Sequence, residues 1–137
     1  MTTPVKPTIR VVAAVIEREG KYLITQRMPR ATMALQWEFP GGKVEPGETD
    51  QVALARELSE EMAVAVRVGD ELVAIVDEYE RYFIDFHVFW CELLSEEIKC
   101  IGVNDYRWVT SVEFEGYTFP AVDQETIDAL LREERPA

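Results

Sequence analysis

Four glutamates and one arginine between positions 48 and 61 are spaced as a metal-binding group would be. Glu57, Glu60 and Glu61 lie three and four residues apart, which places their carboxylates on one face of a helix. Mg²⁺ and Mn²⁺ prefer such oxygen ligands, and a nearby Gly-Gly turn could aim a backbone carbonyl at the same ion. Glu48, eight residues before Arg56, could hold its guanidinium and so orient the carboxylates. The alternative interpretation is a solvated acidic face, as in most Glu-rich helices.

The surrounding residues predict the helix that would carry these carboxylates. Pro46-Gly47 makes a turn, Thr49 is a candidate N-cap, and Asp50 supplies an acid in the first helical turn. Apolar residues then recur at spacings of three and four up to about position 62, namely Val52, Ala55, Leu58 and Met62. This stripe is expected to face the core, with the glutamates roughly opposite.

Six strand-like segments and a C-terminal helix complete the predicted fold. Strands are expected at 8–18, 22–27, 64–68, 71–80, 81–93 and 105–111, with a loop at 28–36 and a short extended piece in WEFPGGK (37–43). The segment 123–134 is expected to be a helix with Ile127, Leu130 and Leu131 on its buried face. One early helix and one late helix among strands predict an α+β layered domain with a mixed sheet.

The composition predicts one globular domain over 1–137, with 1–7 flexible. A net charge of −12 disfavours binding to a nucleic-acid polymer, although a bound cation would admit a small phosphorylated ligand. No run approaches the ~18 apolar residues of a membrane span, and the opening residues lack a secretory signal. Cys91 and Cys100 are expected to be free thiols in a cytoplasmic protein that is a monomer or a homodimer. The single histidine, His87, excludes a multi-histidine zinc site.

The acidic segment resembles the Nudix box of the Nudix hydrolases, GX5EX7REUXEEXGU, in which U is aliphatic. Gly42, Glu48 and the run from Arg56 to Val64 match every ionisable position. Ala63 stands where the family has Gly, and we expect only a small shift at the helix end. The hairpin over 8–27, WEFPGGK and the ending YTFPAVDQETIDALL resemble MutT-type members. The resemblance covers nearly the whole chain and implies a Nudix α/β/α sandwich, a mixed β-sheet between helices with the box as loop–helix–loop.

The resemblance also implies roles within the box. The metal ligands, for Mg²⁺ or Mn²⁺ as a substitute, correspond to the Gly41 carbonyl, Glu57, Glu60 and Glu61. Glu57 is in addition a candidate base or water-orienting residue, and Glu48 and Arg56 match the family's supporting ion pair. Asp105 is a candidate for a further ligand, although a turn-forming Asp after Gly102 is the alternative interpretation.

Six residues are candidates for contacts with the substrate: Arg27, Phe39, Lys43, Tyr82, Phe119 and Asp123. Arg27 and Lys43 are alternatively surface cations, and the aromatic residues are alternatively core residues. Asp123 matches the MutT-type position that reads the base edge. An ionised Asp only accepts hydrogen bonds, so it would favour a base edge with donors, such as the cytosine amino group or guanine N1–H and N2–H₂. Its alternative role is to cap the terminal helix. His87 alternates with Phe86 and Val88, so we expect it on the opposite sheet face with a structural role.

The implied activity is that of a MutT-type pyrophosphohydrolase. It would hydrolyse ribo- or deoxyribonucleoside triphosphates, oxidised ones such as 8-oxo-dGTP or CTP-like ones included, to the monophosphate and pyrophosphate with metal-activated water. One alternative is a nucleotide-sugar or dinucleoside-polyphosphate hydrolase. The other is a non-catalytic Nudix-like module that binds a nucleotide, although such modules usually lose the box glutamates that this chain keeps.

Overall fold

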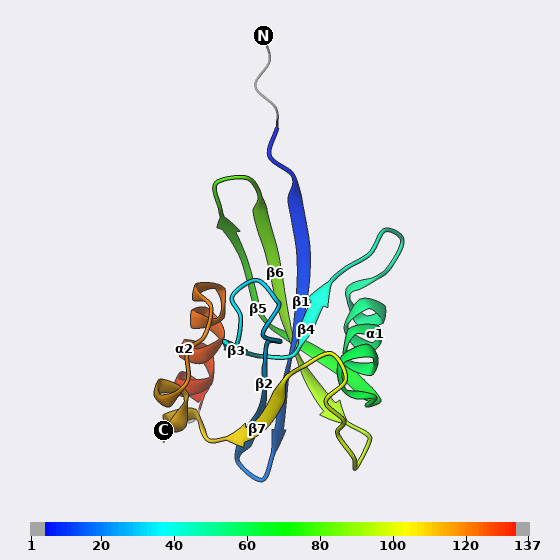
Figure 1. The fold of residues 1–137 in the computed structure, drawn as a ribbon, viewed down its shortest axis with the longest axis vertical. Helices are drawn as coiled ribbons and strands as arrows, with labels where there is room; N and C mark the ends of the chain where they lie inside the picture. The colour runs from blue at the N-terminus through cyan, green and yellow to red at the C-terminus, as the bar shows by residue number, and fades with distance from the viewer. Residues whose placement is uncertain (1–4, 134–137) are drawn as a thin grey trace.

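The computed structural model describes residues 5–133 as strands packed between two helices (Figure 1). In chain order the elements are β1 (Thr8–Arg18), β2 (Lys21–Gln26), β3 (Trp37–Glu38), β4 (Gly41–Lys43), α1 (Asp50–Met62), β5 (Val66–Glu78), β6 (Phe83–Leu93), β7 (Asp105–Val109), the 3₁₀ helices η1 (Ser111–Gly116) and η2 (Ala121–Asp123), and α2 (Gln124–Glu133). Within the described part of the chain, neither α-helix is long and apolar enough to span a bilayer.

The expected flexible segment 1–7 lies partly outside the described residues. In its described part, Lys6 donates a hydrogen bond to the Glu78 carboxylate, and the Pro7 carbonyl accepts one from the Phe83 N–H. These two contacts attach residues 6 and 7 to the turn between β5 and β6.

A mixed sheet is built around β1. This strand pairs in parallel with β6 and antiparallel with β2 and β4, while β5 pairs with β6, and β3 and β7 pair with β2. Helix α1 lies on one side of the sheet and α2 on the other (Figure 1). The predicted α+β architecture, an α/β/α sandwich with a mixed sheet between helices, is therefore confirmed.

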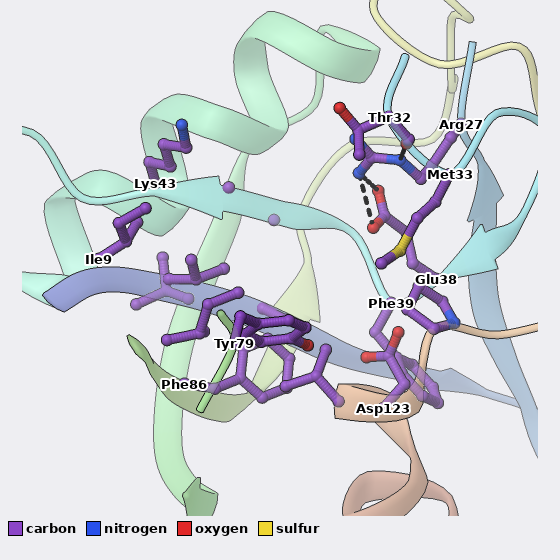
Figure 2. A pocket seen from close by; sticks show the side chains of 18 of the residues that line it. Ile9, Arg27, Thr32, Met33, Glu38, Phe39, Lys43, Tyr79, Phe86 and Asp123 are labelled. Atoms are coloured by element: carbon purple, nitrogen blue, oxygen red, sulfur yellow. Dashed lines mark hydrogen bonds and ion pairs between the residues drawn. The ribbon is translucent and has the colours of Figure 1, made fainter. Parts of the chain in front are cut away.

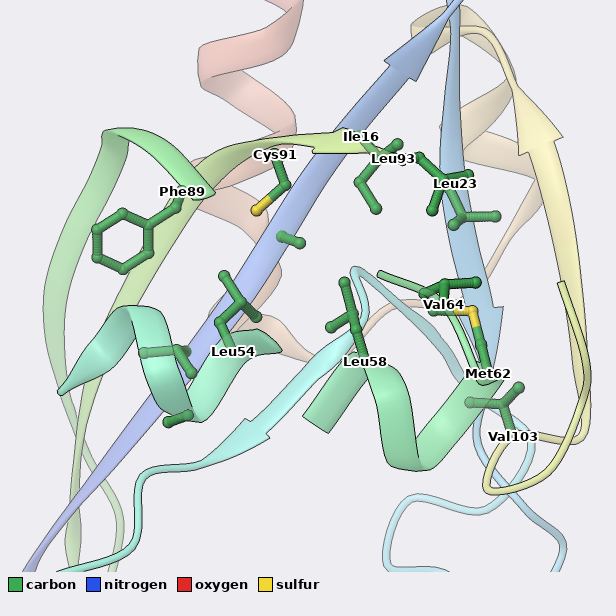
Figure 3. Close-up of a cluster of buried hydrophobic side chains, with 13 residues drawn as sticks. Ile16, Leu23, Leu54, Leu58, Met62, Val64, Phe89, Cys91, Leu93 and Val103 are labelled. Carbon is green, nitrogen blue, oxygen red and sulfur yellow. The ribbon is translucent and has the colours of Figure 1, made fainter. Parts of the chain in front are cut away.

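Two apolar clusters fill the layers on either side of β1. Val12, Ala14 and Ile16 point to the α1 side, and Ala13 and Val15 point to the α2 side, because successive side chains of a strand alternate. Figure 3 shows the α1-side cluster, in which α1 supplies three large side chains, Leu54, Leu58 and Met62. A strand that is buried on both faces explains the continuous apolar run over 11–16.

The predicted count of six strands is wrong in two places: one predicted extended piece forms two strands, and two predicted strands form one. WEFPGGK forms two short strands, because Pro40 redirects the chain from β2, the partner of β3, to β1, the partner of β4. The segments 64–68 and 71–80, predicted as separate strands, form the single strand β5. Its pairing with β6 shifts register between Val68 and Val73, so a β-bulge interrupts the pairing without ending the strand.

The predicted buried face of α1 is only half right. Thr49 caps the helix as expected, with its hydroxyl accepting from the Val52 N–H at 3.2 Å. Val52, however, is 56% exposed, and the buried residues of the helix are Ala53, Leu54, Leu58 and Met62. The helix is rotated relative to the prediction, so Glu57 and Glu61 lie beside its buried face and not opposite it. In α2, likewise, Ile127 and Leu130 are buried but Leu131 is 38% exposed.

Ala63 ends α1 in the left-handed conformation, with φ 57° and ψ 39°. Its N–H donates to the Ser59 carbonyl, which completes the last turn in the way a glycine cap would. An Ala in this conformation costs about 1–2 kcal/mol that Gly would not. Ala63 therefore ends the helix in the same conformation that a glycine would take, at a small energetic cost.

Candidate active site

The glycines of β4 bring the backbone close to the acidic helix. Gly41 and Gly42 pair with Ala13 and Val12 of β1. A Cβ on Gly41 would lie 1.9 Å from the Val12 carbonyl oxygen, and a Cβ on Gly42 would lie 2.3 Å from the Glu57 carboxyl carbon. The two glycines are thus needed for close approach, Gly41 to the central strand and Gly42 to a glutamate of the box.

The predicted ion pair between Glu48 and Arg56 is present and is bidentate. The guanidinium Nε and Nη2 donate to the two Glu48 oxygens at 2.7 and 2.9 Å, and Nη2 also donates to the Lys43 carbonyl. The hydrogen bond from Arg56, followed by one from the Glu45 N–H, lowers the pKa of Glu48. Arg56 therefore ties the loop after β4 to the middle of α1.

The same guanidinium reaches two more carboxylates. Arg56 Nη1 donates to Glu57 at 3.0 Å and to Glu60 at 3.2 Å, although the Glu60 side chain is 61% exposed. Among the described residues no three acidic, histidine or cysteine side chains converge on one point. Here Arg56, and not convergence on a common centre, fixes where Glu57 and Glu60 point.

Among the glutamates of the box, Glu61 is the one whose negative charge is least offset by positive groups. Burial, followed by the charges of Glu38 and Glu57, raises the pKa of Glu61 to about 9. Burial also raises the pKa of Glu57, against the opposing effect of Arg56. In this arrangement Glu61 keeps its proton at neutral pH, and a cation beside it would favour the ionised form.

Two cavities meet beside these carboxylates. The larger, of about 370 Å³, lies between the sheet and η2, and Figure 2 shows its lining side chains. The smaller, of about 210 Å³, lies against α1 and is lined by Glu57 and Glu61. Arg27, Glu38 and Gly41 line both cavities, so the smaller cavity, here called the acidic groove, lies next to a larger cavity of the size that takes small-molecule ligands.

A family model described as NUDIX domain matches residues 11–129. The chain belongs to the Nudix family. The CTP pyrophosphohydrolase of Escherichia coli (strain K12) is 35% identical to it over 131 residues, 94% of this chain and 97% of that protein. An 8-oxo-dGTP diphosphatase of Haemophilus influenzae is 33% identical over 130 residues, 93% of this chain and 95% of that protein. The crystal structure of the MutT protein from Methanosarcina mazei Go1 is similar with a TM-score of 0.85 and 29% identity, covering 98% of this chain and 100% of that one.

Five of the six predicted substrate contacts line the large cavity of this Nudix protein. Arg27, Phe39, Tyr82 and Asp123 line the cavity, and Lys43 lines it near β4 with its amine directed away from Asp123 (Figure 2).

Two predicted site residues lie elsewhere. Phe119 does not line the cavity, because its ring stacks on Phe39 and packs edge-on against Phe114 behind the cavity wall. Asp105 begins β7, where its carboxylate accepts from the Tyr106 N–H and pairs with Arg107. It lines neither cavity.

Glu38 lines both cavities but was not among the site residues predicted from the sequence. Arg27 Nη1 donates to both Glu38 oxygens at 3.1 Å, and Nε donates to the Thr32 carbonyl. Burial raises the pKa of Glu38 more than Arg27 lowers it. Its place in WEFPGGK, one residue before Phe39, could have indicated a carboxylate at the entrance to the box.

Asp123 lies at the deep end of the large cavity and is 2% exposed. Burial, followed by the charge of Glu38, raises its pKa well above the ordinary value. A protonated carboxyl donates one hydrogen bond and accepts others. A protonated Asp123 can therefore donate to a base as well as accept from it, whereas the ionised group considered from the sequence only accepts. The predicted capping role is not seen, because Asp123 is the last residue of η2, which continues directly into α2.

His87 lies on the α1 side of the sheet, opposite Phe86 and Val88 as predicted, within a charged network. Its ring nitrogens lie 2.5 Å from a Glu71 oxygen and 2.8 Å from an Asp85 oxygen. Arg10 bonds the same Asp85 and also Asp50 in the first turn of α1. Burial lowers the pKa of His87, but the hydrogen bonds to Glu71 and Asp85 outweigh it, so the net shift is upward.

The raised pKa of His87 predicts a pH-dependent stability. Its stabilising contribution is full below the unfolded pKa of about 6.5 and is lost as the pH rises through the folded value. We expect the free energy of unfolding, from urea denaturation with EDTA, to fall more steeply between about pH 6 and pH 8 in the parent than in His87→Gln. Glu61, with a pKa of about 9, acts in the same direction in both proteins, so the difference in slope isolates His87. Parallel slopes would show that the imidazole does not bridge the two carboxylates.

Proposed function

We propose that the chain hydrolyses nucleoside triphosphates to the monophosphate and pyrophosphate in the cytoplasm, with Mg²⁺ as its cation. The observation that carries this proposal is that the large cavity and the acidic groove share Arg27, Glu38 and Gly41. A nucleoside in the cavity that ends at Asp123 would direct its phosphates along Gly41 to Glu57. The named activities of the two relatives, CTP pyrophosphohydrolase and 8-oxo-dGTP diphosphatase, belong to this reaction class.

The residues of the groove supply the donor chemistry that a divalent cation needs, although Arg56 holds Glu57 and Glu60 and no three of the described acidic side chains converge on one point in this structure. Glu61 is a half-buried carboxyl near Glu57 and Glu38, and like charges in a partly desolvated place need a positive partner if they are to ionise together. The Gly41 carbonyl and the carboxylates of Glu57, Glu60 and Glu61 would supply hard oxygen ligands of the kind Mg²⁺ prefers. When bound, the cation would neutralise phosphate charge and activate water as the nucleophile.

The chain's own residues would orient the reaction. Water attacks phosphorus, the P–O bond of the α,β bridge breaks, and pyrophosphate leaves. Glu57, held by Arg56 and seated against Gly42, would take the proton of the attacking water. Arg27, already at the junction of the two cavities, would exchange part of its Glu38 pair for a phosphate oxygen.

Product analysis on a panel of triphosphates tests the proposal. We expect Mg²⁺-dependent formation of monophosphate and pyrophosphate from at least one triphosphate, and loss of both products with EDTA. Preferential cleavage of a nucleotide sugar or a dinucleoside polyphosphate would favour the alternative hydrolase. Tight nucleotide binding without turnover of any compound would instead identify a binding module.

Asp123→Asn is expected to change base preference more than rate. The protonated carboxyl of Asp123 presents one O–H donor and acceptor oxygens, whereas Asn presents an NH₂ group with two donors and one acceptor oxygen, so the two side chains favour different base edges. The ratio of kcat/KM between cytosine and guanine triphosphates should shift about tenfold, while kcat for the better substrate changes less. An unchanged substrate profile would remove Asp123 from base recognition.

A further inference from the structure

We propose that Tyr79, backed by Tyr82, stacks on the base of the bound nucleotide, and that Lys6 positions this pair. The inference rests on the proposed function, because it assigns a wall of the same cavity to the nucleobase. It names a contact that neither the box nor the terminal FPAVD segment supplies.

The two tyrosines form one aromatic unit on the turn that joins β5 to β6. The Tyr79 N–H donates to the Tyr82 carbonyl at 2.8 Å and closes the turn. The rings stack with their centroids 5.2 Å apart and an interplanar angle of 21°. Both side chains line the large cavity, where Figure 2 shows Tyr79 between Phe86 and Asp123. Each ring is therefore held in place by the other and by the turn.

Exposure distinguishes these rings from the other aromatic side chains of the cavity. Phe39 and Phe86 are 2% and 4% exposed, and Phe39 also packs against Phe114. Most of their surface is already in contact with the core. Tyr79 and Tyr82 are only half-buried, so they keep ring surface for a ligand. A planar base gains most by stacking on an aromatic ring whose free surface faces the cavity.

The cavity has the polarity that a base requires. Its walls include apolar side chains from two strands, Ile9 and Val11 of β1 and Ile84 of β6, and its deep end carries the Asp123 carboxyl. A base placed against Tyr79 would contact apolar groups on its faces and reach Asp123 with its polar edge. Burial, followed by the charge of Asp77 and its hydrogen bond with the Tyr79 hydroxyl, raises the pKa of Tyr79, so the ring stays neutral.

Lys6 contacts the turn that carries Tyr79 and Tyr82, and it does so from outside the cavity. Its ammonium donates to the Glu78 carboxylate and, at 3.0 Å, to the Tyr79 carbonyl, and it lies 5.3 Å from the centre of the Phe83 ring. The Phe83 N–H donates to the Pro7 carbonyl at 2.9 Å. The segment at residues 6 and 7 thus fixes both ends of the turn, although Lys6 does not line the cavity. Lys6 is accordingly a positioning residue.

Steady-state kinetics with a base-free competitor tests the inference. Tyr79→Leu should raise KM for the preferred triphosphate about tenfold to a hundredfold with little change in kcat. Inhibition by inorganic triphosphate, which has no base, should be unchanged. Tyr79→Phe, which keeps the ring, should stay within about threefold of the parent KM. The matched control is Tyr117→Leu, which removes a half-buried ring that packs on Trp37 outside the cavity and should leave both values unchanged.

Lys6→Met gives a second test that leaves both tyrosines in place. It should raise KM for the triphosphate by a smaller factor than Tyr79→Leu and leave inhibition by inorganic triphosphate unchanged. An unaltered KM in Tyr79→Leu, or an equal loss of affinity for triphosphate and nucleotide, would overturn the stacking role. If the parent released no pyrophosphate from any triphosphate, the proposed function would fail. Nucleoside monophosphate binding to the parent and to Tyr79→Leu, measured by calorimetry, would then still decide whether the tyrosine contacts a base.

Discussion

Glu57→Gln is expected to lower kcat by about a hundredfold to ten-thousandfold, the range that a lost general base produces. The amide has the size of the carboxyl but cannot take a proton and is a weaker cation ligand. The fold should persist, because Glu57 makes a single hydrogen bond with Arg56, which retains its bidentate pair with Glu48. Initial rates of pyrophosphate release under saturating triphosphate and Mg²⁺ measure the effect, and thermal melting checks the fold.

Glu92→Gln is the matched control for this change. Glu92 pairs with Arg67 on an exposed part of the sheet, where both side chains are at least 60% accessible, and it lines neither cavity. An exposed pair of this kind contributes little to stability, so both rate and melting temperature should match the parent. Full activity in Glu57→Gln would show that another group activates the water.

Alanine substitutions at the two β4 glycines are expected to separate stability from activity. In Gly41→Ala the new Cβ would meet backbone of the central strand, with the Val12 oxygen at 1.9 Å and the Ala13 Cα at 2.7 Å. Neither atom can move without displacing β4 from β1, so the free energy of unfolding should fall by about 3 kcal/mol. In Gly42→Ala the three atoms nearest to the new Cβ all belong to the Glu57 carboxyl group, which is the end of a flexible side chain. This variant should keep most of its stability and lose most of its kcat.

Gly116→Ala provides the control, because nothing lies within 4 Å of the position that its Cβ would take. Urea denaturation and pyrophosphate release on the three variants give the comparison. The interpretation of the glycines would be contradicted if Gly42→Ala were as unstable as Gly41→Ala, or if it hydrolysed triphosphates at the parent rate.

The box and its ion pair could be predicted because their geometry is local. Glu48, Arg56 and Glu57 are brought together by one turn and one helix, whose spacings can be counted along the chain. The rotation of α1 could not be predicted in the same way. Whether Val52 or Leu54 is buried depends on how the helix meets β1 and β4, and the apolar residues of the segment allow both stripes.

The remaining site residues depend on pairing between distant segments. Glu38 meets Arg27 because β3 pairs with β2, with Thr25 opposite Glu38. Tyr79 lines the cavity only because β5 continues through its bulge and carries the turn to the level of Asp123. None of these contacts has a spacing along the chain that would reveal it.

The position of Asp105 also depends on the pairing of distant strands. Its place before a strand was visible in the sequence, but pairing with β2 sets it opposite Gln26, and its carboxylate turns to Arg107. Strand register decides which side chains face a site, and a change of one residue reverses the face.

Binding of Mn²⁺, followed by electron paramagnetic resonance, tests most directly whether the acidic helix is a cation site. We expect the parent to bind Mn²⁺ at neutral pH, with protons released as Glu61 ionises, and we expect Mg²⁺ to compete. Glu61→Gln and Glu57→Gln should each weaken binding by at least about tenfold, whereas Glu92→Gln should bind as the parent does. Equal Mn²⁺ affinity in all four proteins would place the cation elsewhere and contradict the account.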